Sequence, residues 1–514
     1  MGVDPLRGMS WKEYFLAAVV VNIFQMAIAF VVFSFQGVLP LNPQGFPGLS
    51  WDLAFMQVIS FATNTNLQHY NGEGNCVQLP NCSSLTGVPG LSYLSQMMAV
   101  QFLQFTSAAT GISVAVAMIR GFIAHSKNLG NFYLDFTRSL TRILLPLCFV
   151  ASLVFVGLGV PQTLNGYQVV TTVEGATQTI LAGPVASLVS IMQLGTNGGG
   201  YYGANSAHPF QNPNPASNMF QIFLMLLIPT SLCFVFGQLI GKKRESRPIL
   251  WGAYGLFALD LLIAFTPSFP VVGPGMEVRF GGFFSVFWTV VTTAMTTGSV
   301  NASLSSLNPL VILSAFNGML IQATPGGKGV GVMYMVMFIV LTVFIVGLMS
   351  GRTPEYLGMK ITARDVKLVM IAFLVHPVII LIPTVLAFST GAAGAIGVRT
   401  NSVGFTQIFY EFTSAASNNG SDFLGASANT PFFNLSTGIV MLLGRFAPIG
   451  LLLALGGSMI NRKRLTTDVG VRTDSFLFSI VIVGSILVLV LLTFFPFLAL
   501  GPIREFFQGR VNGF

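Results

Sequence analysis

Charged residues are scarce in this chain. Among its 514 residues, 24 are Lys or Arg and 16 are Asp or Glu, so the charged fraction is 8%, against roughly 25% in ordinary soluble domains. Hydrophobic residues make up 53%, and the mean hydropathy is +0.75. This composition excludes a soluble enzyme, a nucleic-acid-binding protein and a disordered chain. An all-α membrane protein with many spans remains, because backbone polar groups in lipid must be satisfied within the protein.

Sequence motifs for catalysis are missing as well. The chain has no Asp-Lys-Thr-Gly phosphorylation sequence, no nucleophile elbow and no His-Glu-x-x-His helix. The glycines around Lys328 do not form a Walker loop, which needs Gly where Gln322 stands and Ser or Thr where Gly329 stands. We therefore expect catalysis to reside in another protein. The four histidines lack metal-ligand spacing, and we expect each to be structural: His69, His125, His208 and His376.

Nine apolar segments approach or exceed the roughly 20 residues needed to cross a bilayer. They are residues 13–36, 91–119, 140–160, 216–240, 249–270, 308–350, 366–390, 432–458 and 474–499. The segment 308–350 is too long for one span and is interrupted by glycines at 326, 327 and 329. We expect a broken helix there, since irregular backbone at membrane depth is tolerated where it is buried in protein or lines a cavity.

Most of the Lys and Arg residues lie in every second connection between spans. These connections contain residues 7–12, 120–142, 242–247, 352–367 and 462–472. By the positive-inside rule they face the cytoplasm. The net charge of +8 is therefore explained first by the membrane topology, without an acidic ligand. Cys76 and Cys82 then share an outward connection, where an oxidising exterior permits a disulfide and two free thiols are the alternative. Cys148 and Cys233 lie within spans.

The outward connections contain an internal repeat. Each has a short apolar segment followed by a run of Thr, Asn, Gly and Ser, and then another span. The short segments are residues 51–62, 183–194, 283–295 and 405–417, and the polar runs are 63–66, 195–200, 296–299 and 418–421. A helix too short to cross must re-enter, which would leave the polar run as extended backbone inside the protein.

Four such runs around one axis would form rings of carbonyl oxygens. Rings of this kind replace the hydration shell of a monovalent cation, as in potassium channels. Glycines at 198, 298 and 420, with Asn66 at the fourth position, allow successive carbonyls to face one axis. The runs contain no carboxylate, which favours potassium over a divalent ion. The alternative is that the four runs are exposed turns.

These residues resemble a known family, KdpA, the potassium-binding subunit of the bacterial Kdp potassium-transporting ATPase. The stretches that carry the resemblance extend over nearly the whole chain. They are residues 41–43, 47–54, 63–66, 195–200, 205–210, 351–358, 418–421 and 427–432. The resemblance implies four pseudo-symmetric span, re-entrant loop, span repeats around a central pore, with a final extra span. We place the repeats at residues 1–125, 126–246, 247–360 and 361–465, and the last span and outer tail at 466–514.

The resemblance also implies a function and a set of site residues. The chain would be a non-catalytic, channel-like subunit that takes potassium from outside and passes it to an ATP-hydrolysing partner. It would bind no cofactor other than potassium ions. The implied filter residues are Asn64, Thr65, Asn66, Thr196, Asn197, Gly198, Thr296, Thr297, Gly298, Asn418, Asn419 and Gly420.

Partners and location follow from the same resemblance. The implied partners are a P-type ATPase subunit, a periplasmic accessory subunit and, in many complexes, a small single-span subunit. The implied location is the bacterial cytoplasmic membrane. The alternative is a stand-alone potassium channel or symporter of the same superfamily. An intramembrane enzyme, a third class, lacks any catalytic cluster.

The chain departs from the family pattern in two places. Family members begin with one further span, so either the start codon is misassigned or that helix is absent. The break in the third repeat normally follows an acidic residue, whereas this chain has Gln322 there and Lys328 among the glycines. We expect Gln322, Gly326, Gly327 and Lys328 to take part in gating or coupling. A Lys328 side chain that reaches cytoplasmic water is the alternative.

Arg445 lies midway along the segment 432–458. A central Arg costs roughly 2.5 to 3.5 kcal/mol on insertion scales, which marks it as functional or paired. We hypothesise that Arg445 provides an electrostatic barrier below the filter and couples permeation to the pump. The alternative is a structural ion pair with a carboxylate on a neighbouring span, such as Asp260.

Overall fold

The computed structural model describes residues 4, 7–73, 89–123, 127–266, 272–460, 462–464 and 472–511. Cys76, Cys82 and His125 lie outside these residues, so the question of a disulfide between the two cysteines stays open. Cys148 and Cys233 are buried free thiols. The described residues are mostly helical.

Nine helical segments in the described part of the chain are long and apolar enough to cross a membrane, which confirms the nine predicted spans. The helices that build them are α1 (Trp11–Phe35), α3 (Tyr93–Ser95) with η3 (Gln96–Gln101) and α4 (Phe102–Arg120), α5 (Phe132–Arg138) with η4 (Ser139–Leu144) and α6 (Leu145–Gly157), α8 (Pro215–Leu239), α9 (Ser246–Phe265), α12 (Val330–Met349), α13 (Ala363–Ser389), α16 (Pro431–Met459) and α17 (Phe476–Leu498). The last span continues through η9 (Ala499–Ile503) into α18 (Arg504–Val511).

The predicted short helices are also present, each within three residues of the expected bounds. They are α2 (Trp51–Ala62), α7 (Val185–Leu194), α10 (Gly281–Ala294) and α15 (Ser402–Ala416). The long sixth segment is broken as expected, into α11 (Pro309–Ile321) and α12, with residues 322–329 between them. Asn308 caps α11 by accepting a hydrogen bond from the backbone N–H of Leu310, and α11 ends where Gln322 adopts a left-handed conformation.

The chain folds as four repeats of span, short helix and span, followed by α17. The repeats are α1–α2–α4, α6–α7–α8, α9–α10–α11/α12 and α13–α15–α16. Within repeats, α1 packs on α2, α6 on α7, α9 on α11 and α13 on α16. Between repeats, α10 contacts α8, and α16 of the last repeat contacts α2 and α4 of the first. The first and last repeats are therefore neighbours, and the four repeats close into a circle.

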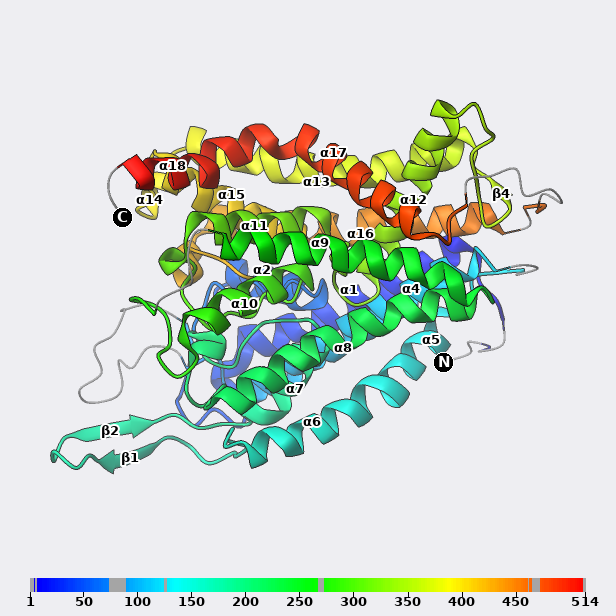
Figure 1. Ribbon diagram of the computed structural model, residues 1–514. Helices are drawn as coiled ribbons and strands as arrows, with labels where there is room; N and C mark the ends of the chain where they lie inside the picture. The colour runs from blue at the N-terminus through cyan, green and yellow to red at the C-terminus, as the bar shows by residue number, and fades with distance from the viewer. Residues whose placement is uncertain are drawn as a thin grey trace.

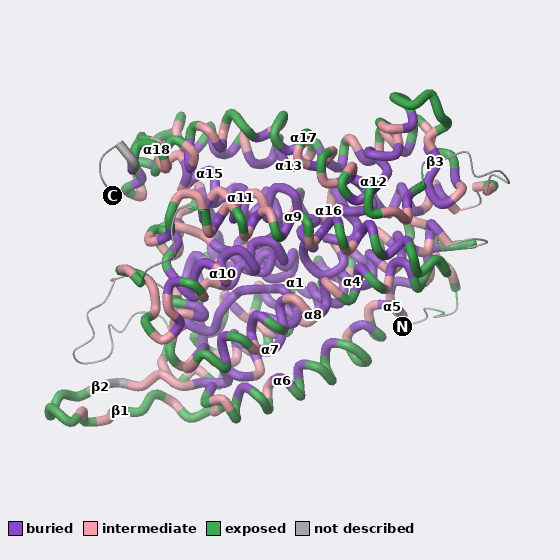
Figure 2. The backbone as a smooth tube through the Cα atoms, in the orientation of Figure 1, coloured by how far each residue is buried: buried purple, intermediate pink, exposed green. Residues whose placement is uncertain are grey.

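The two ends of the molecule carry different features (Figure 1). At one end lie the C-terminus and the hairpin β1 (Gln168–Thr171) and β2 (Thr177–Ile180). At the other end lie the N-terminus and the small hairpin β3 (Glu355–Tyr356) and β4 (Met359–Lys360). The predicted cytoplasmic connections belong to the second end. Figure 2 shows that buried backbone fills the centre, whereas the outlying α6 and α17 expose much of their surface.

Helices α4 and α16 approach closely at the end of the molecule that contains the predicted cytoplasmic connections. A Cβ atom on Gly121, which follows α4, would lie 2.2 Å from the carbonyl oxygen of Gly456 on α16. Small residues permit this kind of close backbone contact between membrane helices. The contact joins the first repeat to the fourth.

We expect Gly121→Val to destabilise the protein by about 1 to 3 kcal/mol, because the added carbons must push the two helices apart. Thermal unfolding of the purified protein in detergent measures this loss. Gly484→Val on α17 is the matched control, since a Cβ there meets nothing within 4 Å. Equal melting temperatures for the two variants would contradict the assigned contact.

Candidate functional site

The four short helices end at the centre of the molecule, and a polar run follows each of them. The last residues of the helices are Ala62, Leu194, Ala294 and Ala416, all buried. The carboxyl end of a helix carries a partial negative charge. Four such ends directed into one buried region create a potential that favours a cation.

The backbone of the four polar runs has one shared pattern. The first and third of the three predicted residues in each run have positive φ, and the middle residue does not. The values are Asn64 67° and Asn66 58°, Thr196 43° and Gly198 85°, Thr296 45° and Gly298 88°, and Asn418 53° and Gly420 106°. Alternation between the two hands turns successive carbonyls to the same side of the strand. A side chain in the left-handed region is strained, and such strain clusters at functional sites.

The four runs contact one another in a fixed cyclic order. A Cβ on Gly198 would lie 1.8 Å from the Thr297 carbonyl oxygen, and one on Gly298 would lie 2.0 Å from that of Asn419. One on Gly420 would lie 2.0 Å from the Thr65 carbonyl oxygen. The remaining junction is made by the Asn66 side-chain amide, which donates to Asn197 Oδ1 at 3.3 Å. The runs therefore form a closed ring in the order first, second, third, fourth.

Three asparagine side chains of the ring donate to backbone or side-chain oxygens of neighbouring segments. Asn64 Nδ2 donates to the Thr196 carbonyl at 2.7 Å, and Asn418 Nδ2 donates to Thr65 Oγ1 at 2.9 Å. Asn419 Nδ2 donates to the Thr292 carbonyl at 3.1 Å. The structure thus brings all twelve predicted filter residues together, and eleven of them are buried while Gly420 is half-buried.

Several residues that support the ring were not singled out from the sequence. Gln104 Nε2 donates to Asn66 Oδ1 at 3.1 Å and to the Gly199 carbonyl at 2.9 Å. Ser107 Oγ donates to Asn64 Oδ1 at 3.0 Å, and Trp288 Nε1 donates to the Ser299 carbonyl at 2.9 Å. Gln104 and Ser107 are polar residues inside an apolar span, which is the signal that could have found them.

An outward hollow of about 60 Å³ lies at the mouth of the ring. It is lined by residues from all four runs or from their exits: Gln68, Tyr70, Asn71, Gly203, Asn205, Gly298, Val300, Gly420, Ser421, Asp422, Gly425 and Ala426. Asp422 is the carboxylate in this lining. The backbone N–H of Gly425, three residues further along the chain, donates to Asp422 Oδ1 at 3.2 Å.

The break between α11 and α12 lies directly against the inner side of the ring. The Gly326 N–H donates to the Ala294 carbonyl at 2.9 Å, and a Cβ on Gly327 would lie 2.2 Å from Thr296 Oγ1. Lys328 is 1% exposed, and its Nζ donates to Thr196 Oγ1 at 3.2 Å. The structure therefore excludes a Lys328 side chain that reaches cytoplasmic water.

Arg445 lies in the same region and is 6% exposed. Its Nη2 donates to the Ser107 carbonyl at 3.2 Å, and a Cβ on Gly111 would touch both this Nη2 and the Lys328 carbonyl. Among the described residues Arg445 forms no ion pair with Asp260, so the structural pair considered from the sequence is wrong. Asp260 lies instead beside α11, where its backbone carbonyl accepts from Ser314 Oγ. Two basic side chains, Lys328 and Arg445, thus lie beneath the ring.

The remaining predicted coupling residue, Gln322, contacts the fourth repeat. Its Nε2 lies 2.8 Å from His376 Nε2 on α13, and the same imidazole nitrogen lies 3.2 Å from the Ala416 carbonyl at the end of α15. His208 stacks on Tyr202 with ring centroids 3.7 Å apart. His376 therefore links the broken helix to the last short helix, and His208 packs in an outward loop.

The fold belongs to a class already known among potassium transporters. The structure is similar to the crystal structure of the potassium transporter TrkH from Vibrio parahaemolyticus, with a TM-score of 0.53 over 85% of this chain and 84% of that chain. At 17% sequence identity, this likeness concerns the fold alone. The fold defines a helical membrane protein built from four repeats of span, short helix and span.

The family follows from the sequence. The family model KdpA, described as potassium-transporting ATPase A subunit, matches residues 1–507. The chain belongs to this family, and it is the potassium-translocating subunit of an ATP-driven potassium importer rather than a stand-alone channel. The family also places an ATPase partner beside it in a multi-pass membrane complex.

Proposed function

We propose that the ring of twelve residues is the potassium filter of this subunit. The observation that carries the proposal is the closed order of the four runs together with their shared alternation of φ. The ligands would be main-chain oxygens from each run, which replace the water around an incoming ion. Thr196 and Gly198 carbonyls each accept a side-chain amide, and each retains a second lone pair for an ion.

The two cations beneath the ring suggest how free conduction is prevented. Lys328 and Arg445 lie below the second and first runs and have no carboxylate partner among the described residues. A cation leaving the ring inward meets their positive charge in a buried region, where charges interact strongly. With Gln322, Gly326 and Gly327, they form the gating and coupling segment of the proposal.

The chain itself would contribute no catalytic residue, and ATP hydrolysis would take place on a P-type ATPase subunit. A periplasmic accessory subunit and a small single-span subunit would complete the complex in the bacterial cytoplasmic membrane. Potassium would be the only ion or cofactor bound by this chain. The exposed outward hairpin β1–β2 and the basic cytoplasmic connections are compatible with partners on both sides.

A structure of the complex in rubidium tests the filter directly. The full chain is purified with its co-purifying subunits and its structure is solved in rubidium and in sodium. We expect rubidium density on the axis of the ring, between the carbonyls of the four runs, and none there in sodium. Density confined to other sites, or none at all, would overturn the filter assignment.

A further inference from the structure

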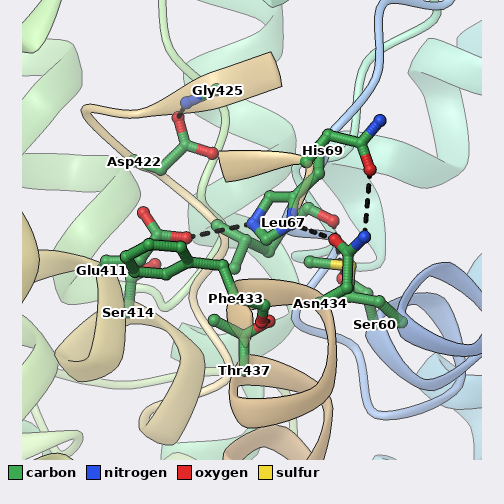
Figure 3. A network of polar contacts seen from close by, with 12 residues as sticks. Ser60, Leu67, His69, Glu411, Ser414, Asp422, Gly425, Phe433, Asn434 and Thr437 are labelled. Carbon is green, nitrogen blue, oxygen red and sulfur yellow. Dashed lines mark hydrogen bonds and ion pairs between the residues drawn. The ribbon is translucent and has the colours of Figure 1, made fainter. Parts of the chain in front are cut away.

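A chain of buried polar side chains crosses the junction between the first and fourth repeats (Figure 3). His69, three residues after the first run, is fully buried. Its Nδ1 lies 2.7 Å from Asn434 Oδ1 on α16, and its Nε2 lies 3.2 Å from Glu411 Oε1 on α15. Asn434 Nδ2 in turn donates to Asp52 Oδ2 at the start of α2, at 2.8 Å. This hydrogen-bonded network joins residues as much as 382 positions apart in the sequence.

The donors and acceptors of this network determine which of its atoms carry hydrogen. Asn434 Nδ2 donates to two acceptors, Asp52 Oδ2 at 2.8 Å and Asn429 Oδ1 at 2.9 Å, so its Oδ1 faces His69. His69 Nδ1 must therefore carry hydrogen. The contact from Nε2 to Glu411 then also needs a proton, because two lone pairs would otherwise face each other. The pair holds this proton as imidazolium and carboxylate or as imidazole and carboxylic acid.

The second carboxyl oxygen of Glu411 has no hydrogen-bond donor among the described residues. Glu411 Oε2 is buried and accepts no hydrogen bond from any residue that the structure describes. A buried oxygen without a partner costs free energy, so a purely structural role leaves it unexplained. A role of Glu411 as a charge close to the path of a cation does account for the unpartnered oxygen. Charges interact strongly across a protein interior from which water is excluded.

Among the residues that the structure describes, few other charged groups lie near the pair. Two titratable groups lie close enough to feel the charge of Glu411: Asp422, which lines the outer hollow, and Tyr410, the neighbour of Glu411 on α15. Asp52 reaches the pair through Asn434 from α2. The other labelled neighbours are uncharged: Ser60, Leu67, Ser414, Phe433 and Thr437 (Figure 3). A change in the charge of the His69–Glu411 pair would therefore strongly change the electrostatic potential behind the outer mouth of the ring.

We propose that His69 and Glu411 form a proton-binding clamp that positions the exit of the first run against the fourth repeat and, through its charge, sets potassium affinity. The inference rests on the proposed filter. With one proton the pair is neutral; loss of that proton leaves one negative charge, and a second proton leaves one positive charge. Proton and potassium then compete, and linkage requires each to weaken the other by the same factor.

The test is potassium titration by calorimetry from pH 5.5 to pH 8.5 on the full chain with its co-purifying subunits. We expect affinity to rise with pH, by roughly three- to tenfold for one added charge, and we expect potassium binding to release protons into a weakly buffered solution. Glu411→Gln preserves the shape but cannot ionise, and His69→Gln removes the other proton site. Both variants should lose the pH dependence and the proton release.

His208→Gln is the matched control. It also removes a histidine, one that is half-buried in an outward loop. Partial burial and the neighbouring Arg279 lower the pKa of His208 to about 4, so this residue stays neutral over the range and the variant should behave as the wild type. Absence of proton release from the wild type, or its retention in both Glu411→Gln and His69→Gln, would overturn the clamp. Rubidium on the ring axis together with either of these results would refute the clamp alone and leave the filter intact.

Discussion

Replacing Gly198 with Asp should lower potassium affinity by roughly 100-fold, which is about 2.8 kcal/mol. The Cβ would lie 1.8 Å from the Thr297 carbonyl oxygen and 2.6 Å from the Ser299 nitrogen, so the third run must move. Gly198 also has φ +85°, a conformation that a side chain strains. The displaced Thr297 carbonyl is one of the proposed ligands, and a carboxylate would then stand in a ring that selects by main-chain geometry. Selectivity for potassium over sodium should fall together with affinity.

The measurement is potassium and sodium titration of the purified complex, together with the recovery of its partner subunits. Assembly should persist, because the ring lies away from the outer surface. Gly391→Asp is the matched control: φ is +76° and a Cβ meets nothing within 4 Å, so this variant carries the same backbone strain without a steric clash. Unchanged potassium uptake by Gly198→Asp would count against the filter assignment.

Replacing Arg445 with Met should leave potassium affinity within about threefold of the wild type and increase passive potassium flux about tenfold or more. Arg445 does not bind the twelve ring residues directly, since its Nη2 donates to the Ser107 carbonyl. Its charge nevertheless lies beneath the ring beside Lys328, where it opposes a cation that leaves inward. Without that charge, ions should pass without ATP hydrolysis, and the uptake driven by each ATP should fall.

Flux of rubidium into proteoliposomes, measured without ATP, tests this expectation. Arg445→Lys keeps the charge and should keep passive flux low, whereas Lys328→Met should raise it. Met favours insertion of α16 more than Arg does, so a folded variant is expected. Complete loss of the assembled protein would instead indicate that Arg445 has a structural role.

The spans and short helices could be predicted because both depend on local composition. The length of an apolar segment can be read from the sequence, and this length decides whether a helix crosses the membrane or re-enters. The predicted segment 51–62 coincides with α2, and the segment 183–194 is shortened only to Val185–Leu194. The glycines after α11 predict the break in the same local way, since they disfavour a continuous helix.

The partners of individual side chains could not be predicted in the same way. A lysine among glycines at the end of a span is compatible with cytoplasmic water, yet Lys328 Nζ binds Thr196 of another repeat. Arg445 could have paired with Asp260, but the packing of α16 against α4 places it beside Ser107 instead. Such contacts depend on which helices become neighbours, and residue types alone do not encode that choice.

Residue identity along the chain was sufficient to establish a membrane protein with nine spans, four re-entrant segments and four polar runs without carboxylates, because hydropathy and segment length are local properties. The folded protein alone decided the cyclic order of the runs, the cations beneath them and the His69–Glu411 contact across 342 positions. Those features arise only when distant helices pack together and bury polar groups, which must then find partners in whatever segment lies beside them.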